Sequence, residues 1–214
     1  MTRDMEITLK GEKFLLLFHR AVFRPSSRQL ILTDVHLGKT SHFRKHGIPL
    51  PPQSHLKDLD KLRFLIAEWQ PATVLILGDL FHSQYNREWL WFKALLMEHP
   101  DISFILVEGN HDILPNAEYQ LPNLLNADQI EEDNFIFSHS PLENIEDKLN
   151  FCGHLHPGIR LTGTARQSIT LPCFYNTHRH FVIPAFGHLT GIIPLKKEEG
   201  VDIYPVTHET VVKI

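Results

Sequence analysis

The stretch Leu30-Ile31-Leu32-Thr33-Asp34-Val35-His36 joins a run of aliphatic residues to a carboxylate and an imidazole. Three consecutive aliphatic residues predict a short strand buried in the core of the protein. In an extended chain, residues two positions apart point to the same side, so Asp34 and His36 can face one ligand. The stretch therefore predicts a central strand with two polar side chains at its carboxyl end.

The same arrangement of an apolar run followed by polar side chains recurs four times further along the chain. Gly78-Asp79 follows residues 74–77, Gly109-Asn110-His111-Asp112 follows residues 102–107, His139 follows residues 135–138, and Gly153-His154-Leu155-His156 follows residues 149–152. Open α/β sheets bind ligands beyond the carboxyl ends of their strands, so these clusters are expected to meet. Oxygen and imidazole donors without thiolates suit hard or borderline divalent metals. The series predicts a hydrolase with two metal ions.

The members of these clusters differ in how much they indicate. Asp79 follows a glycine that allows close backbone approach, and one carboxylate there can bridge two metals about 3.5–4 Å apart. The alternative for Asp79 is a turn or helix-capping aspartate. Asn110 is expected to bind through its carbonyl oxygen, and the His111 imidazole to face a phosphate. Asp112 would orient that imidazole, although aspartate is also an ordinary turn residue. His139 supplies a further imidazole, or is only a polar loop residue.

Strands and helices alternate in the first half of the chain. Apolar strands are expected at residues 30–32, 74–77 and 102–107, and helices at residues 56–69 and 87–98. This alternation predicts parallel pairing in an α/β sandwich. Two strands are expected before a turn at Pro25-Ser26-Ser27. After residue 128, short strands are expected at residues 135–137, 150–152, 158–161, 168–171, 180–183 and 201–206, the last pairing with residues 210–214. No linker divides the chain, so a single domain over residues 1–214 is expected.

The composition is that of an ordinary soluble protein. The chain has 214 residues, of which 43% are hydrophobic and 21% charged, and its formal net charge is −4. That charge neither favours nor excludes nucleic acid, because two divalent cations would add about four positive charges at the site. Cys152 and Cys173 are expected to be buried, reduced thiols. No apolar run is long enough for a membrane span or a signal peptide, so a cytoplasmic location is expected.

The ordered series Asp-x-His, Gly-Asp, Gly-Asn-His-Asp, His and Gly-His-x-His resembles the motifs of the calcineurin-like metallophosphoesterase superfamily over residues 30–157. The resemblance implies a four-layer α-β-β-α sandwich and a phosphoesterase in which a hydroxide bridging two metals attacks phosphorus in line. It implies that His111 is a general acid or stabilises the transition state. It assigns the metal ligands as Asp34, His36 and His156 for one metal, Asn110, His139 and His154 for the other, and Asp79 for both.

Within the superfamily, the chain is similar to the bacterial DNA-ligase-associated metallophosphoesterases. The similarity rests on residues 32–39, on the loop segments 42–44 and 47–51, and on Pro184-Ala185-Phe186-Gly187. It implies a phosphodiesterase or endonuclease that acts on DNA or RNA and uses manganese, with iron, zinc or magnesium as the other candidates. It also implies a functional association with an ATP-dependent DNA ligase, an exonuclease and a helicase. Residues 174–180 depart from the aromatic-rich segment of that group.

Several basic residues outside the motifs are candidate substrate contacts. His42, Arg44 and Lys45 follow the first motif and would grip a nucleic-acid backbone, or else form a solvated basic loop. His82 would contact the substrate or support a metal ligand. Residues 178–180 form a second basic cluster, for which an ordinary surface role is the better interpretation.

Two other functions stay open on the sequence alone. One is a phosphatase, or a phosphodiesterase or pyrophosphatase acting on nucleotides and other small molecules. The lack of a recognisable capping domain favours an open site for a polymer over this alternative. The second is a non-enzymatic scaffold with a decayed site, against which the complete ligand set argues. Trp89 and Trp91 are expected in the core or an interface rather than in a base-stacking surface, and the apolar face of helix 87–98 would support a homodimer.

Overall fold

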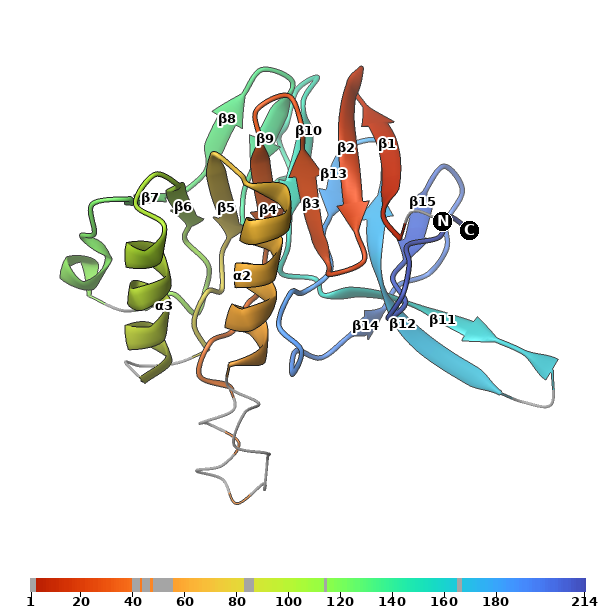
Figure 1. The fold of residues 1–214 in the computed structure, drawn as a ribbon. Coiled ribbons are helices and arrows are strands. Elements are labelled where there is room, and N and C mark those ends of the chain that lie inside the picture. The colour runs from red at the N-terminus through yellow and green to blue at the C-terminus, as the bar shows by residue number, and fades with distance from the viewer. Residues whose placement is uncertain are drawn as a thin grey trace.

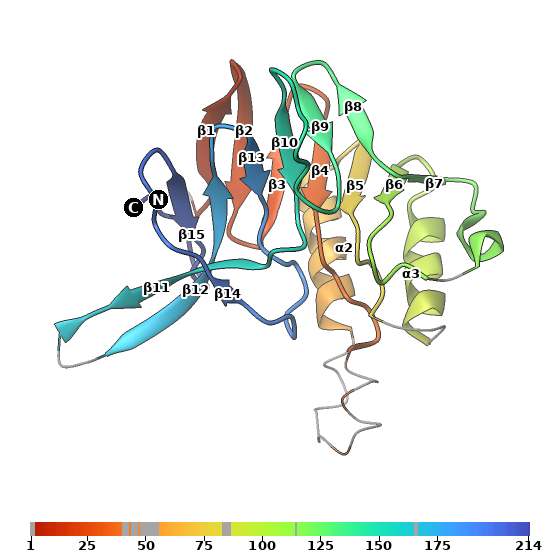
Figure 2. The ribbon, with the colours of Figure 1, turned by 180° about the vertical axis from the view of Figure 1, so that it is seen from behind.

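In the part of the chain that the structure describes, two mixed β-sheets pack face to face, and two α-helices cover the outer face of the first sheet (Figures 1 and 2). The computed structural model describes residues 3–39, 43, 47, 56–82, 87–113, 115–164 and 167–214. The expected α/β sandwich is confirmed.

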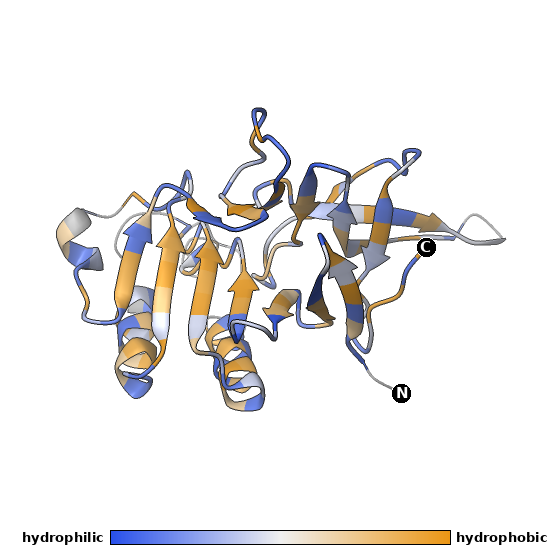
Figure 3. Ribbon diagram, turned by 90° about the horizontal axis from the view of Figure 1, so that it is seen from above, coloured by the Kyte–Doolittle hydropathy of each residue, from blue (hydrophilic) through white to orange (hydrophobic). Residues whose placement is uncertain are grey.

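The first sheet contains seven strands whose order in space follows the sequence. They are β1 (Met5–Leu9), β2 (Glu12–Leu17), β3 (Ala21–Arg24), β4 (Gln29–Leu32), β5 (Thr73–Leu77), β6 (Ser103–Val107) and β7 (Leu124–Ala127). Strands β1 to β4 pair antiparallel, and β4 to β7 pair parallel. Figure 3 shows hydrophobic residues along most of the parallel strands beside the helices. Such continuous apolar runs are typical of strands that are covered on both faces.

Two helices, α2 (Lys57–Trp69) and α3 (Arg87–Glu98), connect the parallel strands, and the short 3₁₀ helix η2 (Asn116–Tyr119) precedes β7. The apolar residues on the buried face of α2 have the spacing of one helix stripe and are Leu59, Leu62, Leu65 and Ile66. The helix ends where Gln70 adopts a left-handed conformation, with φ of 44°, and donates its N–H to the carbonyl of Ile66. Both helices share one apolar cluster with the first sheet.

The second sheet contains the strands that follow β7. They are β8 (Ile130–Glu132), β9 (Phe135–Phe137), β10 (Leu149–Cys152), β11 (Pro157–Thr162), β12 (Ser168–Asn176), β13 (His180–Val182), β14 (Ile193–Pro194) and β15 (Asp202–Pro205). Their order in space is β14-β11-β12-β13-β10-β9-β8, and β15 pairs with β12. Strands β9, β10 and β13 are parallel, so β9 and β10 end at the same edge. The β11–β12 hairpin projects beyond the sandwich (Figure 1).

An aromatic core holds the two sheets together. Phe151 of β10 lies within it, with its ring centroid 5.1 Å from that of Phe14, 5.3 Å from that of Phe137 and 5.0 Å from that of Phe181. All four side chains are fully buried. Aromatic rings at such separations combine a large buried apolar area with favourable ring contacts. Since Phe14 belongs to the first sheet and the other three to the second, this cluster fixes the position of one sheet on the other.

The structure differs from the sequence expectation at the edges of the sheets. Three strands precede Pro25 instead of two, because Lys10 and Gly11 form a tight turn with φ of 48° and 83°. Strands β7, β8 and β14 were not predicted. Each lies at the edge of a sheet and is partly exposed, so it lacks the apolar pattern of the central strands. Residues 210–214 form no strand and pair with β15 only through an isolated bridge between Val206 and Val211 and neighbouring backbone hydrogen bonds.

The expected fourth layer of helices is also absent from the part of the chain that the structure describes. Residues 140–148 cover part of the outer face of the second sheet instead. Within this segment Ile145 is buried, and the N–H of Leu142 donates to the side-chain oxygen of Asn150 on β10. The carbonyl of Leu142 lies 2.8 Å from Nε2 of His180 on β13. A loop fastened to the sheet by hydrogen bonds thus takes the place of a helix.

Cys152 and Cys173 are free and fully buried, as predicted. Burial raises the pKa of both thiols, that of Cys173 to about 12, so they behave as small apolar core residues. Among the described residues, no helix has the length and apolar character needed to span a membrane.

Replacing Phe151 by alanine should lower the free energy of unfolding by about 3–5 kcal/mol, because it leaves a cavity between the two sheets. Urea unfolding of both proteins measures this loss. Met97→Ala is the matched control, since Met97 on α3 is 75% exposed and its truncation should cost less than about 0.5 kcal/mol. Equal losses in the two variants would contradict the role given to the aromatic core.

Candidate metal centre

The polar clusters of the sequence meet at one edge of the sandwich and form two groups that could each hold a metal ion. The first group is Asp34, His36 and His156, and the second is Asp79, His139 and His154. In each group, one potential ligand atom from every residue lies within 4.8 Å of the others. Aspartates after β4 and β5 of the first sheet face histidines after β9 and β10 of the second sheet. Each group therefore draws its residues from both sheets.

The backbone of these residues is left-handed rather than extended. Five of the six have positive φ, namely Asp34 (51°), His36 (51°), Asp79 (50°), His154 (64°) and His156 (45°). Asp34 and His36 do converge, but the reason given by the sequence, alternation along an extended strand, is wrong. Left-handed non-glycine residues cost about 1–3 kcal/mol each and persist where the surroundings hold them. Here the N–H of Asp34 donates to the carbonyl of Gly78 at 3.1 Å, and that of His36 to the carbonyl of Asp79 at 2.9 Å.

The first group contains buried polar atoms that have no hydrogen-bond partner among the residues that the structure describes. They are Oδ1 of Asp34, both ring nitrogens of His36 and Nε2 of His156. Oδ1 of Asp34 lies 3.3 Å from Nε2 of His156. Buried polar atoms without partners are costly and rare, and a cation between them would satisfy three of the four. The donor set of one carboxylate and two imidazoles fits a divalent metal.

The surroundings of the first group favour the unprotonated forms of His36 and Asp34. Burial lowers the pKa of His36 to about 3, so its imidazole is neutral at pH 7. Burial alone would raise the pKa of Asp34, but His156, His139 and the Thr33 hydroxyl outweigh it and hold that pKa below its ordinary value. Neutral imidazole and ionised carboxylate are the forms that bind a metal.

The second group is oriented by a backbone carbonyl. Nδ1 of His139 lies 3.0 Å from the carbonyl oxygen of Leu77, which places the ring proton on Nδ1 and leaves Nε2 as a lone pair. That Nε2 lies 3.0 Å from Nδ1 of His154 and 3.5 Å from Oδ1 of Asp79. The three atoms thus converge on one point, as ligands of a cation do.

Asp79 lies between the two groups. Its Oδ1 faces His139, and its Oδ2 lies 3.8 Å from Nε2 of His36 in the first group. Its Oδ1 also accepts the backbone N–H of His111 at 2.9 Å. A carboxylate whose two oxygens face two ligand groups has the geometry needed to bridge two metals.

The loop after β6 places its three polar residues differently. Asn110 is exposed, and within the described part of the chain its side chain makes no hydrogen bond. His111 is also exposed, with its ring centroid 5.4 Å from that of His36 and stacked on His82 at 5.6 Å. Asp112 is buried and accepts the backbone N–H groups of Phe81 at 3.1 Å and Gly109 at 3.0 Å.

The hydrogen bonds of Asp112 therefore fix the backbone around His111, whereas the sequence suggested that Asp112 orients the His111 ring. Burial raises the pKa of Asp112 to about 7, which is typical of a carboxyl group enclosed beside a site.

Glycines allow the turns of the site to approach one another. A Cβ on Gly109 would lie 2.3 Å from the backbone nitrogen of Asp79 and 2.5 Å from its Oδ1. A Cβ on Gly153 would lie 1.8 Å from Oγ1 of Thr33. Such a role was expected from the sequence for Gly78, where φ is 75° and a Cβ would lie 2.4 Å from Nδ1 of His139.

Two supports of the site were not singled out from the sequence. Thr33 bonds through its hydroxyl to the carbonyl of Leu77 at 2.7 Å and to Oδ2 of Asp34 at 2.9 Å. The Phe186 and Gly187 N–H groups bond to the carbonyls of Thr33 and Asp34 at 2.9 and 3.0 Å. In the sequence, the segment Pro184–Gly187 was noted only as a family motif. The structure shows that it lies against the Asp34 turn. The signal for Thr33 that the sequence offers is a hydroxyl residue directly before Asp34.

The remaining candidates are placed as follows. His82 stacks on His111 and lies 5.6 Å from His36 between ring centroids, so it borders the first group. His42, Arg44 and Lys45 lie outside the described residues. Residues 178–180 are at the amino end of β13, the opposite edge from the site.

Both tryptophans contribute to the core, as predicted. Trp89 is fully buried, and Trp91 packs partly buried against the cluster that α2 and α3 share with the first sheet.

Gly109→Ala should weaken Mn²⁺ binding by about 10–100-fold, because the added methyl group displaces the backbone and carboxylate of Asp79. Calorimetric titration of the metal-free protein with Mn²⁺ measures the effect. Gly163→Ala is the control, since a Cβ at Gly163 meets no atom within 4 Å. Unchanged Mn²⁺ affinity in Gly109→Ala would remove Asp79 from the centre.

Comparisons with known proteins bear on the fold and the family of the chain. Curated protein sequences give no match. The chain is similar in structure to Pseudomonas putida nuclease MPE, with a TM-score of 0.81, 23% identity and coverage of 99% of this chain and 100% of that one. It is more distantly similar to Yfce, a phosphoesterase from E. coli, with a TM-score of 0.45, 12% identity and coverage of 87% and 97%.

At 23% identity, the likeness to the nuclease structure concerns the fold alone. The family match is broader, because residues 27–208 match the calcineurin-like phosphoesterase family and include both ligand groups. The family and the two groups together imply two divalent metal ions. The chain therefore belongs to the calcineurin-like phosphoesterase family and is a metal-dependent phosphoester hydrolase.

Proposed function

We propose that this protein is a two-metal phosphodiesterase that cleaves nucleic acid, acting as an endonuclease on DNA in a ligase-associated repair pathway. The observation that carries the proposal is the position of Asp79, whose two oxygens face one ligand group each. A shared carboxylate between two imidazole-rich groups suits the paired divalent ions that stabilise the attacking and leaving oxygens of a phosphoryl displacement.

In this proposal the chain supplies seven ligands. Asp34, His36 and His156 bind one ion, Asn110, His139 and His154 bind the other, and Asp79 binds both. Mn²⁺ is the ion we infer, because oxygen and neutral imidazole donors without thiolate suit it. Two such ions, when bound, provide Lewis-acid charge for the phosphoryl oxygens and lower the pKa of water from about 15.7 to about 7.

His111 is the proton donor in the proposal. Its ring is exposed beside the first group, and its backbone N–H bonds to Oδ1 of the shared carboxylate, which holds the residue over the centre. From there the imidazole can give its proton to the leaving oxygen, or donate a hydrogen bond to the developing charge. Asp112 keeps the loop in place through the amides of Phe81 and Gly109.

The choice of a polymer substrate rests on the openness of the site. The described residues add no second domain over this edge of the sandwich, and His111 is exposed there. A site that encloses a small substrate would be expected to bury its proton donor. The alternative hypothesis is a phosphatase, and it would be established if the enzyme prefers p-nitrophenyl phosphate, a monoester, to the diester.

The ligase-associated assignment rests on the family motifs and on the role that one of them has in this fold. The motif Pro184–Gly187 donates two backbone hydrogen bonds to the Asp34 turn, so it belongs to the architecture of the centre. The fold similarity to a nuclease agrees with the assignment. We infer a cytoplasmic protein that works with an ATP-dependent DNA ligase, an exonuclease and a helicase.

The first experiment is Mn²⁺-dependent hydrolysis of bis-p-nitrophenyl phosphate, p-nitrophenyl phosphate and a labelled single-stranded DNA. His111→Ala should reduce kcat for the diester and DNA by about 10²–10⁴-fold, because the proton donor is lost, while the Mn²⁺ content stays at two ions per chain. His178→Ala, an exposed histidine at the opposite edge, should match the wild type. Loss of metal in His111→Ala would show that His111 is a ligand instead.

Asp79→Asn should reduce the Mn²⁺ content from two ions per chain to near zero, since both ions lose a charged ligand. Metal analysis by mass spectrometry after gel filtration gives the count. Asp133→Asn is a matched control, because Asp133 also has positive φ (44°) but lies in the exposed β8–β9 turn. Retention of one full ion in Asp79→Asn would contradict the bridging role.

A further inference from the structure

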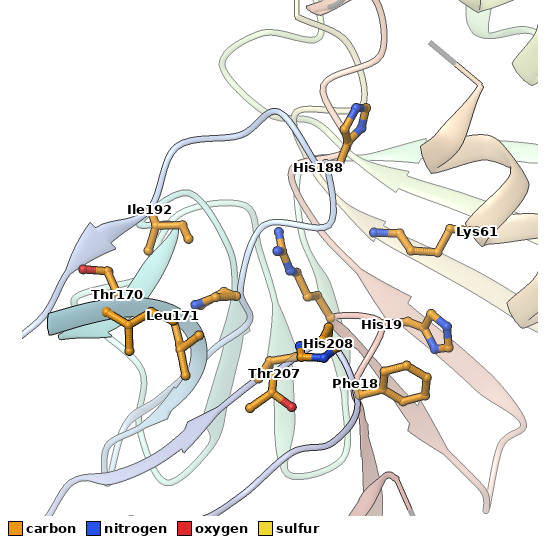
Figure 4. A pocket seen from close by; sticks show the side chains of 13 residues that line it. Phe18, His19, Lys61, Thr170, Leu171, His188, Ile192, Thr207 and His208 are labelled. Carbon is orange, nitrogen blue, oxygen red and sulfur yellow. The ribbon is translucent and has the colours of Figure 1, made fainter. Parts of the chain in front are cut away.

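A cavity separate from the two ligand groups opens on the other side of the loop that contacts the Asp34 turn. Its volume is about 760 Å³, within the range of small-molecule sites, and it lies between the β2–β3 turn, α2, the β11–β12 hairpin and the segments that follow β13 and β15. None of the seven proposed metal ligands lines it. Figure 4 shows His19 and Lys61 on one side of the cavity and Leu171 and Ile192 on the other.

One wall of the cavity carries an excess of positive charge. Arg20 and Lys61 both line it, and the carboxylate of Asp58 lies 3.6 Å from the Lys61 ammonium and also favours the charged form of Arg20. Asp58 is also engaged by His188, whose Nδ1 lies 2.8 Å from its Oδ2. Two cations therefore share one carboxylate that is already paired.

The two cations disfavour each other. Burial, with a contribution from the charge of Arg20, outweighs the opposing effect of Asp58 and lowers the pKa of Lys61 to about 8. Burial also lowers the pKa of Arg20, and burial together with Lys61 lowers that of His19. Within the described residues, the Arg20 guanidinium makes one long hydrogen bond, at 3.4 Å, to the carbonyl of Ala185. A bound anion would relieve this repulsion and satisfy the remaining guanidinium donors.

The opposite wall is apolar. Ile169 and Leu171 of β12 line it together with Ile192, whereas Phe18 lies beside His19 on the other side of the cavity (Figure 4). Ile169 is 56% exposed although it is large and aliphatic. A ligand that matches both walls has an anionic group at one end and a flat or apolar group at the other. A nucleotide has this character, with its phosphate and its base.

A single loop separates this cavity from the metal centre. Gly187 donates its N–H to the carbonyl of Asp34, and the next residue, His188, lines the cavity. Lys61 donates to the carbonyl of Phe186 in the same loop at 2.5 Å, and its ammonium lies 3.6 Å from the centre of the Phe186 ring. The metal centre and the cavity thus lie against the same loop, residues 186–188.

We propose that this cavity binds a nucleotide of the substrate strand that flanks the scissile phosphate. Its phosphate contacts Arg20 and Lys61, and its base packs on Ile169, Leu171 and Ile192. This inference rests on the proposed nuclease function and adds to it a subsite that requires a polymer.

The test is the binding of oligothymidylate eight nucleotides long, measured as inhibition of bis-p-nitrophenyl phosphate hydrolysis by the Mn²⁺-loaded enzyme. Arg20→Gln should weaken this inhibition about tenfold more than it affects hydrolysis of the small diester itself. The slope of log affinity against log salt should become shallower by about 0.7, the loss of one single-strand phosphate contact. Lys61→Gln should act in the same direction and serves as the second variant if Arg20→Gln unfolds, as judged by its melting temperature.

Lys13→Gln is the matched control for lost charge, because Lys13 is an exposed residue of β2 near the opposite edge of the sandwich. It should leave both the inhibition and the salt slope as in the wild type. Inhibition and salt slope equal to wild type in both Arg20→Gln and Lys61→Gln would overturn the subsite. Thymidine monophosphate binding as tightly as the oligomer would also overturn it, because the cavity would then serve a free nucleotide.

The outcomes separate this proposal from the proposed function. If the wild type hydrolyses the small diester but leaves DNA intact, the nuclease proposal fails. Oligothymidylate inhibition that still depends on Arg20 would then support the subsite alone. If DNA is cleaved and neither variant changes the inhibition, the nuclease proposal stands and the subsite fails.

Discussion

The side chain of Asp79 has two oxygens that face different imidazoles. The positions of the two sheets and of the turns after their strands must be fixed to maintain this arrangement. Oδ2 lies 3.8 Å from His36, which follows a strand of the first sheet, and Oδ1 lies 3.5 Å from His139, which follows a strand of the second. Metal ligation tolerates errors of only about 0.2 Å in each distance. The two sheets must therefore be held in a fixed relation, and the aromatic cluster around Phe151 does this between them.

The same constraint explains why the site is built from strained turns. An extended strand end would point the side chains of Asp34, Asp79 and His154 to the faces of the sheet, whereas left-handed turns bring their ligand atoms into two compact groups. The cost of these conformations is offset by hydrogen bonds between the turns, such as the one from Asp34 N–H to the Gly78 carbonyl. Glycine at position 109 admits Asp79 where any side chain would collide with it. Strain at the centre is thus supported by contacts that have no chemical role of their own.

The central strands and the polar clusters can be predicted from the sequence because both follow from local patterns. Residues 74–77 are apolar on both faces, and Asp79 follows them directly. Edge strands such as β8 lack this signal, since their partly exposed residues need no alternation of apolar and polar positions. The hydrogen bonds of Asp112 could not be predicted from the sequence either, because they depend on where the backbone of Phe81 lies. A tripeptide pattern cannot specify the partner of a buried carboxylate.

The cavity beside the metal centre was even less predictable from the sequence. Arg20, Lys61, Leu171 and Ile192 are far apart in sequence, and none of them belongs to a motif. Only the fold brings the β2–β3 turn, α2 and the projecting hairpin together around the loop that follows β13. That loop has one side on the Asp34 turn and the other on the cavity, so a group bound at Lys61 would bear on the backbone that supports a proposed metal ligand. Holding a flanking nucleotide there would fix the orientation of the scissile phosphate, and orientation is a large part of what a rigid site contributes to a displacement at phosphorus.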